Sequence, residues 1–93
     1  MNSPFFFRLN QVAFIHLDRQ MILTIHKHVI TRIPRFEITH DKHHSWNLHI
    51  SQIQKEDKGY YMCQINTDPM IYEVGFVNVV GEHAGGGKII LSL

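Results

Sequence analysis

The chain has one cysteine, Cys63, among its 93 residues. An internal disulfide is therefore excluded, although small extracellular domains often depend on such bonds. Charge of one sign is also scarce, because nine Lys and Arg stand against eight Asp and Glu. This balance excludes the basic surface by which many proteins bind nucleic acid, and it gives no acidic tail. A chain of this length can form one domain around a single core.

Long apolar runs are absent as well. No stretch approaches the roughly 20 apolar residues needed to cross a bilayer. The N-terminal segment has only the triplet Phe5-Phe-Phe7, where a secretory signal needs about 7 to 15 apolar residues. No Asn-x-Ser/Thr glycosylation site occurs. We therefore expect neither a signal peptide nor a transmembrane segment in this chain, and any membrane attachment to come from parts of the protein outside it.

The sequence also lacks the motifs of an enzyme. No pair of carboxylates marks a catalytic cleft, and Gly85-Gly-Gly87 has neither the Lys-Ser/Thr nor the strand order of a phosphate-binding loop. A Cys-His pair is conceivable, but a catalytic thiolate needs exposure and a positive neighbour, whereas Cys63 is predicted to point inward. We expect no catalysis, no small-molecule substrate and no cofactor.

Eight histidines are present, and His40, His43, His44 and His49 lie close together in the sequence. Zinc sites favour three or four ligands at fixed geometry, whereas a polar His-x-x-His-His turn without cysteine is more often solvated. We therefore predict no metal site. His16, His26 and His28 could titrate near pH 6.5 close to the predicted binding sheet, although nothing in the sequence ties them to a switch.

Residues 11–81 read as short segments rich in β-branched and aromatic residues, separated by turn signals and without a helical period. Two of these segments alternate around a polar turn at residues 40–44 and predict a hairpin. The fold class is therefore all-β. Residues 1–10 are expected to lie outside the domain, and residues 82–93 to form a flexible tail. The expected strands are residues 12–17, 21–25, 28–31, 35–39, 46–51, 60–66 and 72–80.

The most informative motif is Asp57-Lys-Gly59-Tyr-Tyr61-Met-Cys63. D-x-G-x-Y-x-C is typical of the corner between strands E and F of an immunoglobulin sandwich. Gly59 relieves the backbone at a tight turn, and the hydroxyl of Tyr61 is expected to bond to backbone just upstream. Cys63 would face the opposite sheet, where this chain has no second cysteine. The motif predicts an immunoglobulin-like β-sandwich.

Three segments extend this similarity: Gln20–Ile25, Trp46–Ile50 and Tyr61–Met70. With them, residues 12–80 resemble the first, variable-type immunoglobulin domain of insect Dpr-interacting proteins and lachesin, which are similar to vertebrate IgLON proteins. The resemblance implies recognition and adhesion between neurons, including synaptic partner choice. It also implies a place at the extracellular face of the plasma membrane.

The resemblance implies the strand assignment C, C′, C″, D, E, F and G for the seven expected strands, with strands A and B lacking. Phe14 stands where the family has a strand C tryptophan, and the strand B cysteine is absent. Arg35 is expected to pair with Asp57 across the bottom of the sandwich; the alternative is a solvated surface pair. The expected structural residues are Phe14, Arg35, Trp46, Leu48, Asp57, Gly59, Tyr61 and Cys63.

In such a sandwich, alternate residues of strands C, F and G point away from the core and form one outward face. With Phe14, Tyr61, Cys63, Val77 and Val79 inward, the outward set is largely apolar, as interface cores are. The resemblance implies that this face binds another immunoglobulin domain, with Gln64 and Asn66 as polar centres. The alternative is that the chain's own tails or a different register cover the set. The expected partner-binding residues are Ala13, Ile15, Leu17, Tyr60, Met62, Gln64, Asn66 and Phe76.

Two other classes remain open from the sequence. The chain could be an incomplete gene model or splice fragment that exposes an unpaired sheet edge and the core side meant for strand B, without binding activity. It could instead use the histidine-rich hairpin to bind zinc, in which case zinc would raise the melting temperature.

Overall fold

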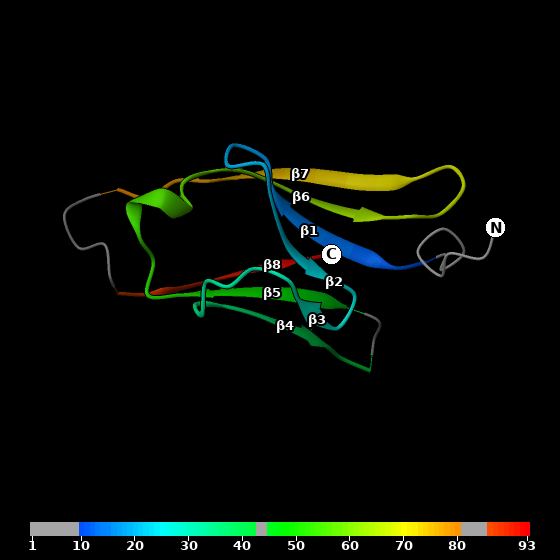
Figure 1. Ribbon diagram of the computed structural model, residues 1–93, viewed down its shortest axis with the longest axis horizontal. Helices are drawn as coiled ribbons and strands as arrows, with labels where there is room; N and C mark the ends of the chain where they lie inside the picture. The colour runs from blue at the N-terminus through cyan, green and yellow to red at the C-terminus, as the bar shows by residue number, and fades with distance from the viewer. Residues whose placement is uncertain (1–9, 43–44, 81–85) are drawn as a thin grey trace.

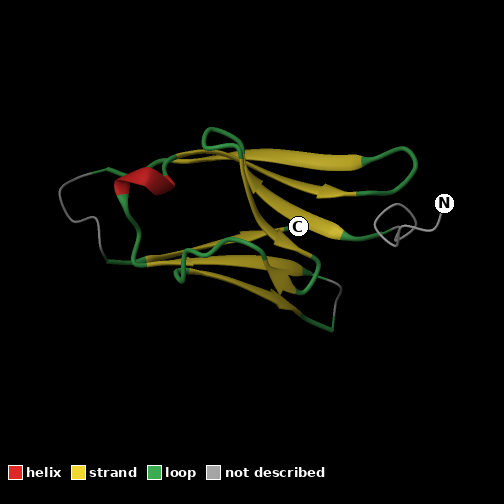
Figure 2. Cartoon of the chain, viewed as in Figure 1, coloured by secondary structure: helices red, strands yellow, loops and turns green. Residues whose placement is uncertain are grey.

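The computed structural model describes residues 10–42, 45–80 and 86–93. In these residues the chain forms strands β1 to β8 and one short 3₁₀ helix, η1 (Lys55–Asp57). The strands lie in two layers that face each other, with η1 at one end where the chain passes between them (Figures 1 and 2). The predicted all-β class and sandwich architecture are confirmed. No helix in the described residues is long and apolar enough to cross a membrane.

The first layer is a five-stranded antiparallel sheet in the order β3-β2-β1-β6-β7. Four of its strands match predicted segments within three residues at each end, and the short β3 ends two residues early. The expected turn after β1 also forms, because the Gln20 amide donates to the Leu17 carbonyl. The strands are β1 (Val12–His16), β2 (Met21–Ile25), β3 (His28–Val29), β6 (Gly59–Ile65) and β7 (Ile71–Val77).

The second layer is a three-stranded antiparallel sheet in the order β4-β5-β8, formed by β4 (Phe36–His40), β5 (Trp46–Ser51) and β8 (Lys88–Ser92). The predicted hairpin is confirmed by the pairing of β4 with β5. His43 and His44, in its expected turn, lie outside the described residues. Residues 1–9, most of the expected N-terminal segment, also lie outside them.

A flexible tail is expected over residues 82–93, and strand β8 corrects this expectation for residues 88–92. Residues 88–92 pair with residues 47–51 of β5, on the side that β4 leaves free. In an immunoglobulin sandwich this place beside strand E belongs to strand B. The physical reason lies in the alternation of the tail, since Ile89, Leu91 and Leu93 pack against the core while Ile90 faces solvent. The fragment alternative predicts that the side of the core meant for strand B is exposed. In the structure β8 covers this side.

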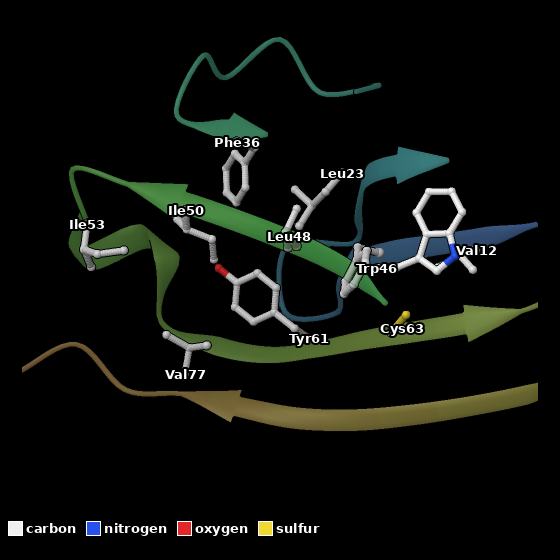
Figure 3. Packing of buried hydrophobic residues seen from close by; sticks show 11 residues of the cluster. Val12, Leu23, Phe36, Trp46, Leu48, Ile50, Ile53, Tyr61, Cys63 and Val77 are labelled. Atoms are coloured by element: carbon white, nitrogen blue, oxygen red, sulfur yellow. The ribbon is translucent and has the colours of Figure 1, made fainter. Parts of the chain in front are cut away.

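The core lies between the two layers. Figure 3 shows Tyr61 and Cys63 of β6 and Val12 of β1 facing Leu48 and Ile50 of β5. The expected structural residues Phe14, Trp46 and Leu48 are all buried. Each buried aliphatic or aromatic side chain contributes about 1.5–3 kcal/mol relative to exposure. The buried hydrophobic residues are Val12, Phe14, Leu23, Phe36, Trp46, Leu48, Ile50, Ile53, Tyr61, Cys63 and Val77.

The corner motif forms as the sequence predicts. The hydroxyl of Tyr61 donates to the carbonyl oxygen of Asp57 at 2.5 Å. Gly59 has φ +135°, and a Cβ there would lie 1.9 Å from the Asp18 carboxylate and 2.9 Å from Nε2 of the buried His16, so a side chain would strain the backbone and displace both neighbours. The corner therefore needs glycine both for its backbone conformation and for space.

An ion pair fixes the same corner to the second sheet. The guanidinium of Arg35 donates to both carboxylate oxygens of Asp57, at 2.6 and 2.9 Å. The Asp57 side chain is fully buried and that of Arg35 is 14% exposed, so the alternative of a solvated surface pair is wrong. The hydrogen bond to Asp57 also raises the pKa of Arg35. The expected pairing is confirmed and joins the segment before β4 to the turn before β6.

Candidate functional site: the outer face of the five-stranded sheet

The outer face of the first sheet can be read from its register. Met62 of β6 lies between Ile15 of β1 and Val74 of β7, and residues opposite each other in an antiparallel sheet share a face. The same register places Ala13, Gln64 and Tyr72 in the row on one side of Met62, and Tyr60 and Phe76 in the row on its other side. We call this surface the sheet face; it comprises Ala13, Ile15, Ile22, Ile25, Tyr60, Met62, Gln64, Tyr72, Val74 and Phe76.

The sheet face carries large exposed apolar side chains and no charged residue. Tyr60, Tyr72 and Phe76 are 50%, 58% and 51% exposed. The rings of Tyr60 and Phe76 meet edge to face, with centroids 4.9 Å apart. Aromatic enrichment and depletion of charge distinguish the centres of protein interfaces from the rest of a protein surface. The arrangement therefore favours contact with another protein.

A hollow of about 200 Å³ lies in the same face, on the side of β2. Its apolar residues are Ala13, Ile15, Ile22 and Ile25, and the rim includes polar side chains such as Gln64. The hollow can accept an apolar side chain of a partner, while the rim amide offers hydrogen-bond donors and an acceptor. Interface anchors commonly occupy hollows of this kind.

The structure places the expected partner-binding residues unequally. Ala13, Ile15, Tyr60, Met62, Gln64 and Phe76 lie together on the sheet face. Leu17 is half-buried in the turn after β1. The Asn66 side chain already accepts a hydrogen bond from the Gln11 amide at 2.6 Å, so its carbonyl oxygen holds the start of β1 as well as lining the hollow. The partner-binding role of the whole set stays a prediction.

Four members of the sheet face were not predicted from the sequence. Tyr72 and Val74 follow from the same alternation as Phe76 and could have been found by continuing it along β7. Ile22 and Ile25 could not, because the register of β1 with β2 shifts between Phe14 and Ile15.

This shift is a β-bulge. Both Leu23 and Thr24 are fully buried, so two successive residues of β2 face inward. Ile22 and Ile25 therefore share the outer face although they are three positions apart, which strict alternation does not allow.

A second hollow, of about 310 Å³, opens between β7 and β8. Cys63 lines this hollow together with Phe14, Tyr61 and Leu91. Leu91 of β8 is therefore the residue of the second sheet that shares the hollow with the thiol. The thiol is only 7% exposed, and burial raises its pKa to about 12. A thiol of this kind stays protonated at neutral pH and is a poor nucleophile. The expected inward orientation of Cys63 is confirmed.

This burial gives a test in solution. We expect Cys63 in the folded protein to react with a disulfide reagent at pH 8 at least about a hundredfold more slowly than in urea, since modification requires opening of the sandwich. The absorbance of the released thiolate follows the reaction. Equal rates in the two states would show that Cys63 is accessible and that the sheets are not closed over it.

The described histidines make separate contacts within the fold and do not gather at one site. His16 is fully buried and stacks on Tyr61 at a centroid distance of 4.3 Å. His26 and His40 contact Trp46, at centroid distances of 4.5 and 4.0 Å. His49 hydrogen-bonds to Thr39 at 2.8 Å. Among the described residues no three His, Cys, Asp or Glu side chains converge as metal ligands would.

Comparison with known proteins agrees with this geometry. The model of the immunoglobulin V-set domain family matches residues 13–80. A chain in the crystal structure of Dpr1 IG1 bound to DIP-eta IG1 is 48% identical, with TM-score 0.71 over 75% of this chain and 67% of that one. The RIG-5 IG1 homodimer is similar too, with 32% identity and TM-score 0.70 over 77% of this chain and 70% of that one.

A longer relative is known from sequence. Residues of this chain are 26% identical over 57 positions to the "Zwei Ig domain protein zig-8" of Caenorhabditis elegans. The match covers 61% of this chain and 21% of that protein. The matched part of the chain thus spans about a fifth of the length of this relative.

Proposed function

Because the chain belongs to the immunoglobulin V-set family, we propose that its sheet face binds a second immunoglobulin domain in recognition between cells. The family is shown by the match over residues 13–80. Structures similar to this chain by both sequence and fold are complexes in which two IG1 domains associate, as in Dpr1 with DIP-eta and in the RIG-5 homodimer. The proposed partner is therefore of the same superfamily.

The single observation that carries the proposal is the composition of the sheet face. Its three aromatic side chains, together with Ile22 and Val74, are each about half exposed, and it contains no charge. A soluble monomer rarely exposes a contiguous apolar surface of this kind without function. The mechanism is docking of one sheet on another, with Tyr60 and Phe76 as aromatic anchors and the hollow at Ile22 receiving a side chain of the partner.

The same resemblance supports a proposal for the setting of this function. We propose that the domain acts at the extracellular face of the plasma membrane, in adhesion between neurons and the choice of synaptic partners. A binding role of this kind needs no cofactor and no catalytic residue.

Binding is tested with IG1 domains of the Dpr, DIP and RIG-5 type as probes, by surface plasmon resonance. We expect saturable binding to at least one probe, and Ile22→Lys to weaken it at least about tenfold, because a lysine in the apolar hollow loses its hydration. Ile90→Lys is the matched control, because Ile90 is similarly exposed but lies on the other sheet.

Thermal melting in the same samples separates the proposal from the fragment alternative. Cooperative unfolding together with saturable binding supports an active recognition module. Aggregation without a transition, and no binding to any probe, would contradict it. Equal loss of binding in Ile22→Lys and Ile90→Lys would show that the sheet face is not the binding surface.

A further inference from the structure

Strand β7 has one free edge. It is paired with β6 on one side, and no described strand pairs with it on the other. β7 has seven residues, whereas β3 at the opposite edge of the sheet has two. An unpaired edge presents backbone N–H and C=O groups that can pair with another strand. β7 is thus the longest free edge of its sheet.

β7 is also exposed on both of its faces. Every residue from Ile71 to Phe76 is exposed, including Glu73 and Gly75, which share the inner side of the sheet with Cys63 and Tyr61. The 310 Å³ hollow between β7 and β8 lies along this inner side. The other long strands of the sheet have their inner side buried in the core. Among the described residues, β7 therefore combines an unpaired edge with an exposed inner side.

The strand carries only one of the usual protections of an edge. Natural edges are blunted by proline, lysine, bulges or an inward-pointing charge, and of these β7 has only the last, in Glu73. Residues 71–77 contain no proline and no lysine, and β7 pairs with β6 without a register shift. Such an edge is suited to pairing rather than to exclusion of other strands.

We propose that the free edge of β7 pairs antiparallel with β7 of a second copy of this chain, which joins the two five-stranded sheets into one. Pairing of one edge with itself about a two-fold axis closes the assembly, because both free edges are used. The backbone edge of β7 is not part of the sheet face. The outward side chains Tyr72, Val74 and Phe76 belong to both surfaces. The proposal does not depend on the proposed function.

The sequence of β7 is complementary to itself in this register. With Val74 at the two-fold axis, Val74 faces Val74 of the second copy, and Tyr72 faces Phe76 of the second copy. Aromatic and β-branched pairs of this kind stabilise antiparallel strands. The apolar outer row of β7 would then continue from one copy into the other.

The charges of β7 fit the same register. Its one charged residue, Glu73, lies opposite Gly75 of the second copy. A Cβ on Gly75 would meet no atom within 4 Å, so there is room for the glutamate side chain. No two like charges are directly opposed. The two Glu73 side chains are diagonal neighbours, at about 7–8 Å, which is close to the screening length of physiological salt.

A charge-pair experiment tests the proposal by sedimentation velocity. The wild-type chain is expected to dimerise, and Val74→Lys and Val74→Glu are each expected to raise the dimer dissociation constant at least about tenfold, because like charges then face each other at the axis. An equal mixture of the two variants is expected to restore the dimer, because opposite charges face each other. Restoration cannot arise from misfolded protein.

Two further variants sharpen the test. Val29→Lys makes the same change on β3, at the opposite edge of the sheet, and is expected to dimerise as the wild type does. Glu73→Gln removes the diagonal repulsion and is expected to tighten the dimer about two- to fivefold at low salt. A variant that tightens association cannot act by general destabilisation.

The proposal is overturned by any of three results. The wild-type chain could stay monomeric at the highest soluble concentration, which would leave the edge free or available to an extended segment of another protein. The mixture of Val74→Lys and Val74→Glu could stay monomeric. The dimer could be abolished by Ile22→Lys and not restored by the charge pair, which would assign self-association to the sheet face.

Discussion

Replacing Asp57 by alanine is expected to lower the free energy of unfolding by about 3–5 kcal/mol, because it breaks a buried ion pair and leaves one charge unpaired. The Asp57 carboxylate is fully buried and accepts two hydrogen bonds from Arg35. It also accepts a bond from the Gln54 amide at 2.7 Å. In the variant the Arg35 side chain, which is only 14% exposed, has no carboxylate to pair with. The Gln54 amide at the start of the 3₁₀ helix also loses its acceptor.

Urea denaturation followed by tryptophan fluorescence measures this loss, with Trp46 as the reporter. The matched control is Glu56→Ala, which removes an exposed carboxylate from the same 3₁₀ helix and is expected to change stability by less than about 0.5 kcal/mol. If the two variants lose similar amounts, the Arg35–Asp57 pair does not hold the corner.

Deleting residues 86–93 is expected to cost at least about 3 kcal/mol and to broaden or abolish the unfolding transition. The deletion removes β8 and with it the partly buried side chains of Ile89, Leu91 and Leu93. It also uncovers one edge of β5, whose Leu48 and Ile50 are fully buried in the intact chain. A domain of this size has little stability to lose.

Two point changes separate the packing of β8 from its backbone pairing. Leu91→Asp is expected to destabilise by about 2 kcal/mol or more, because it removes an apolar side chain packed against the core and puts a carboxylate into the hollow beside Phe14 and Tyr61. Ile90→Asp changes the neighbouring residue on the opposite face and is expected to have little effect. A truncated chain that melts like the full-length protein would show that β8 does not stabilise the sandwich.

Much of the fold could be predicted because local signals and the global fold agree. The corner motif specifies Gly59, Tyr61 and Asp57 together, and each makes the expected contact. Alternation in β1 and β6 likewise predicts which side chains face the core, since Phe14 and Cys63 are both buried. These segments obey strict period two, so their faces follow from the sequence alone.

The parts that could not be predicted depend on pairing at a distance. The tail contains a glycine run, which favours a flexible segment, and nothing local reveals that residues 88–92 find β5 more than 35 residues earlier. The bulge in β2 depends on how that strand fits β1, so the outward placement of Ile22 and Ile25 had no sequence signal. The pairing of β8 and the bulge in β2 both depend on contacts with strands that are distant in the sequence or on the fit between strands, and not on local sequence.

The position of β8 in the chain has a consequence for biosynthesis. A ribosome delivers β4 and β5 well before the strand that pairs with the other edge of β5. Until translation has passed the codons for residues 88–92, the nascent sandwich keeps one edge of β5 open, and such intermediates attract chaperones or aggregate. A stop codon placed just before β8 would therefore be as harmful as a lesion in the hydrophobic interior.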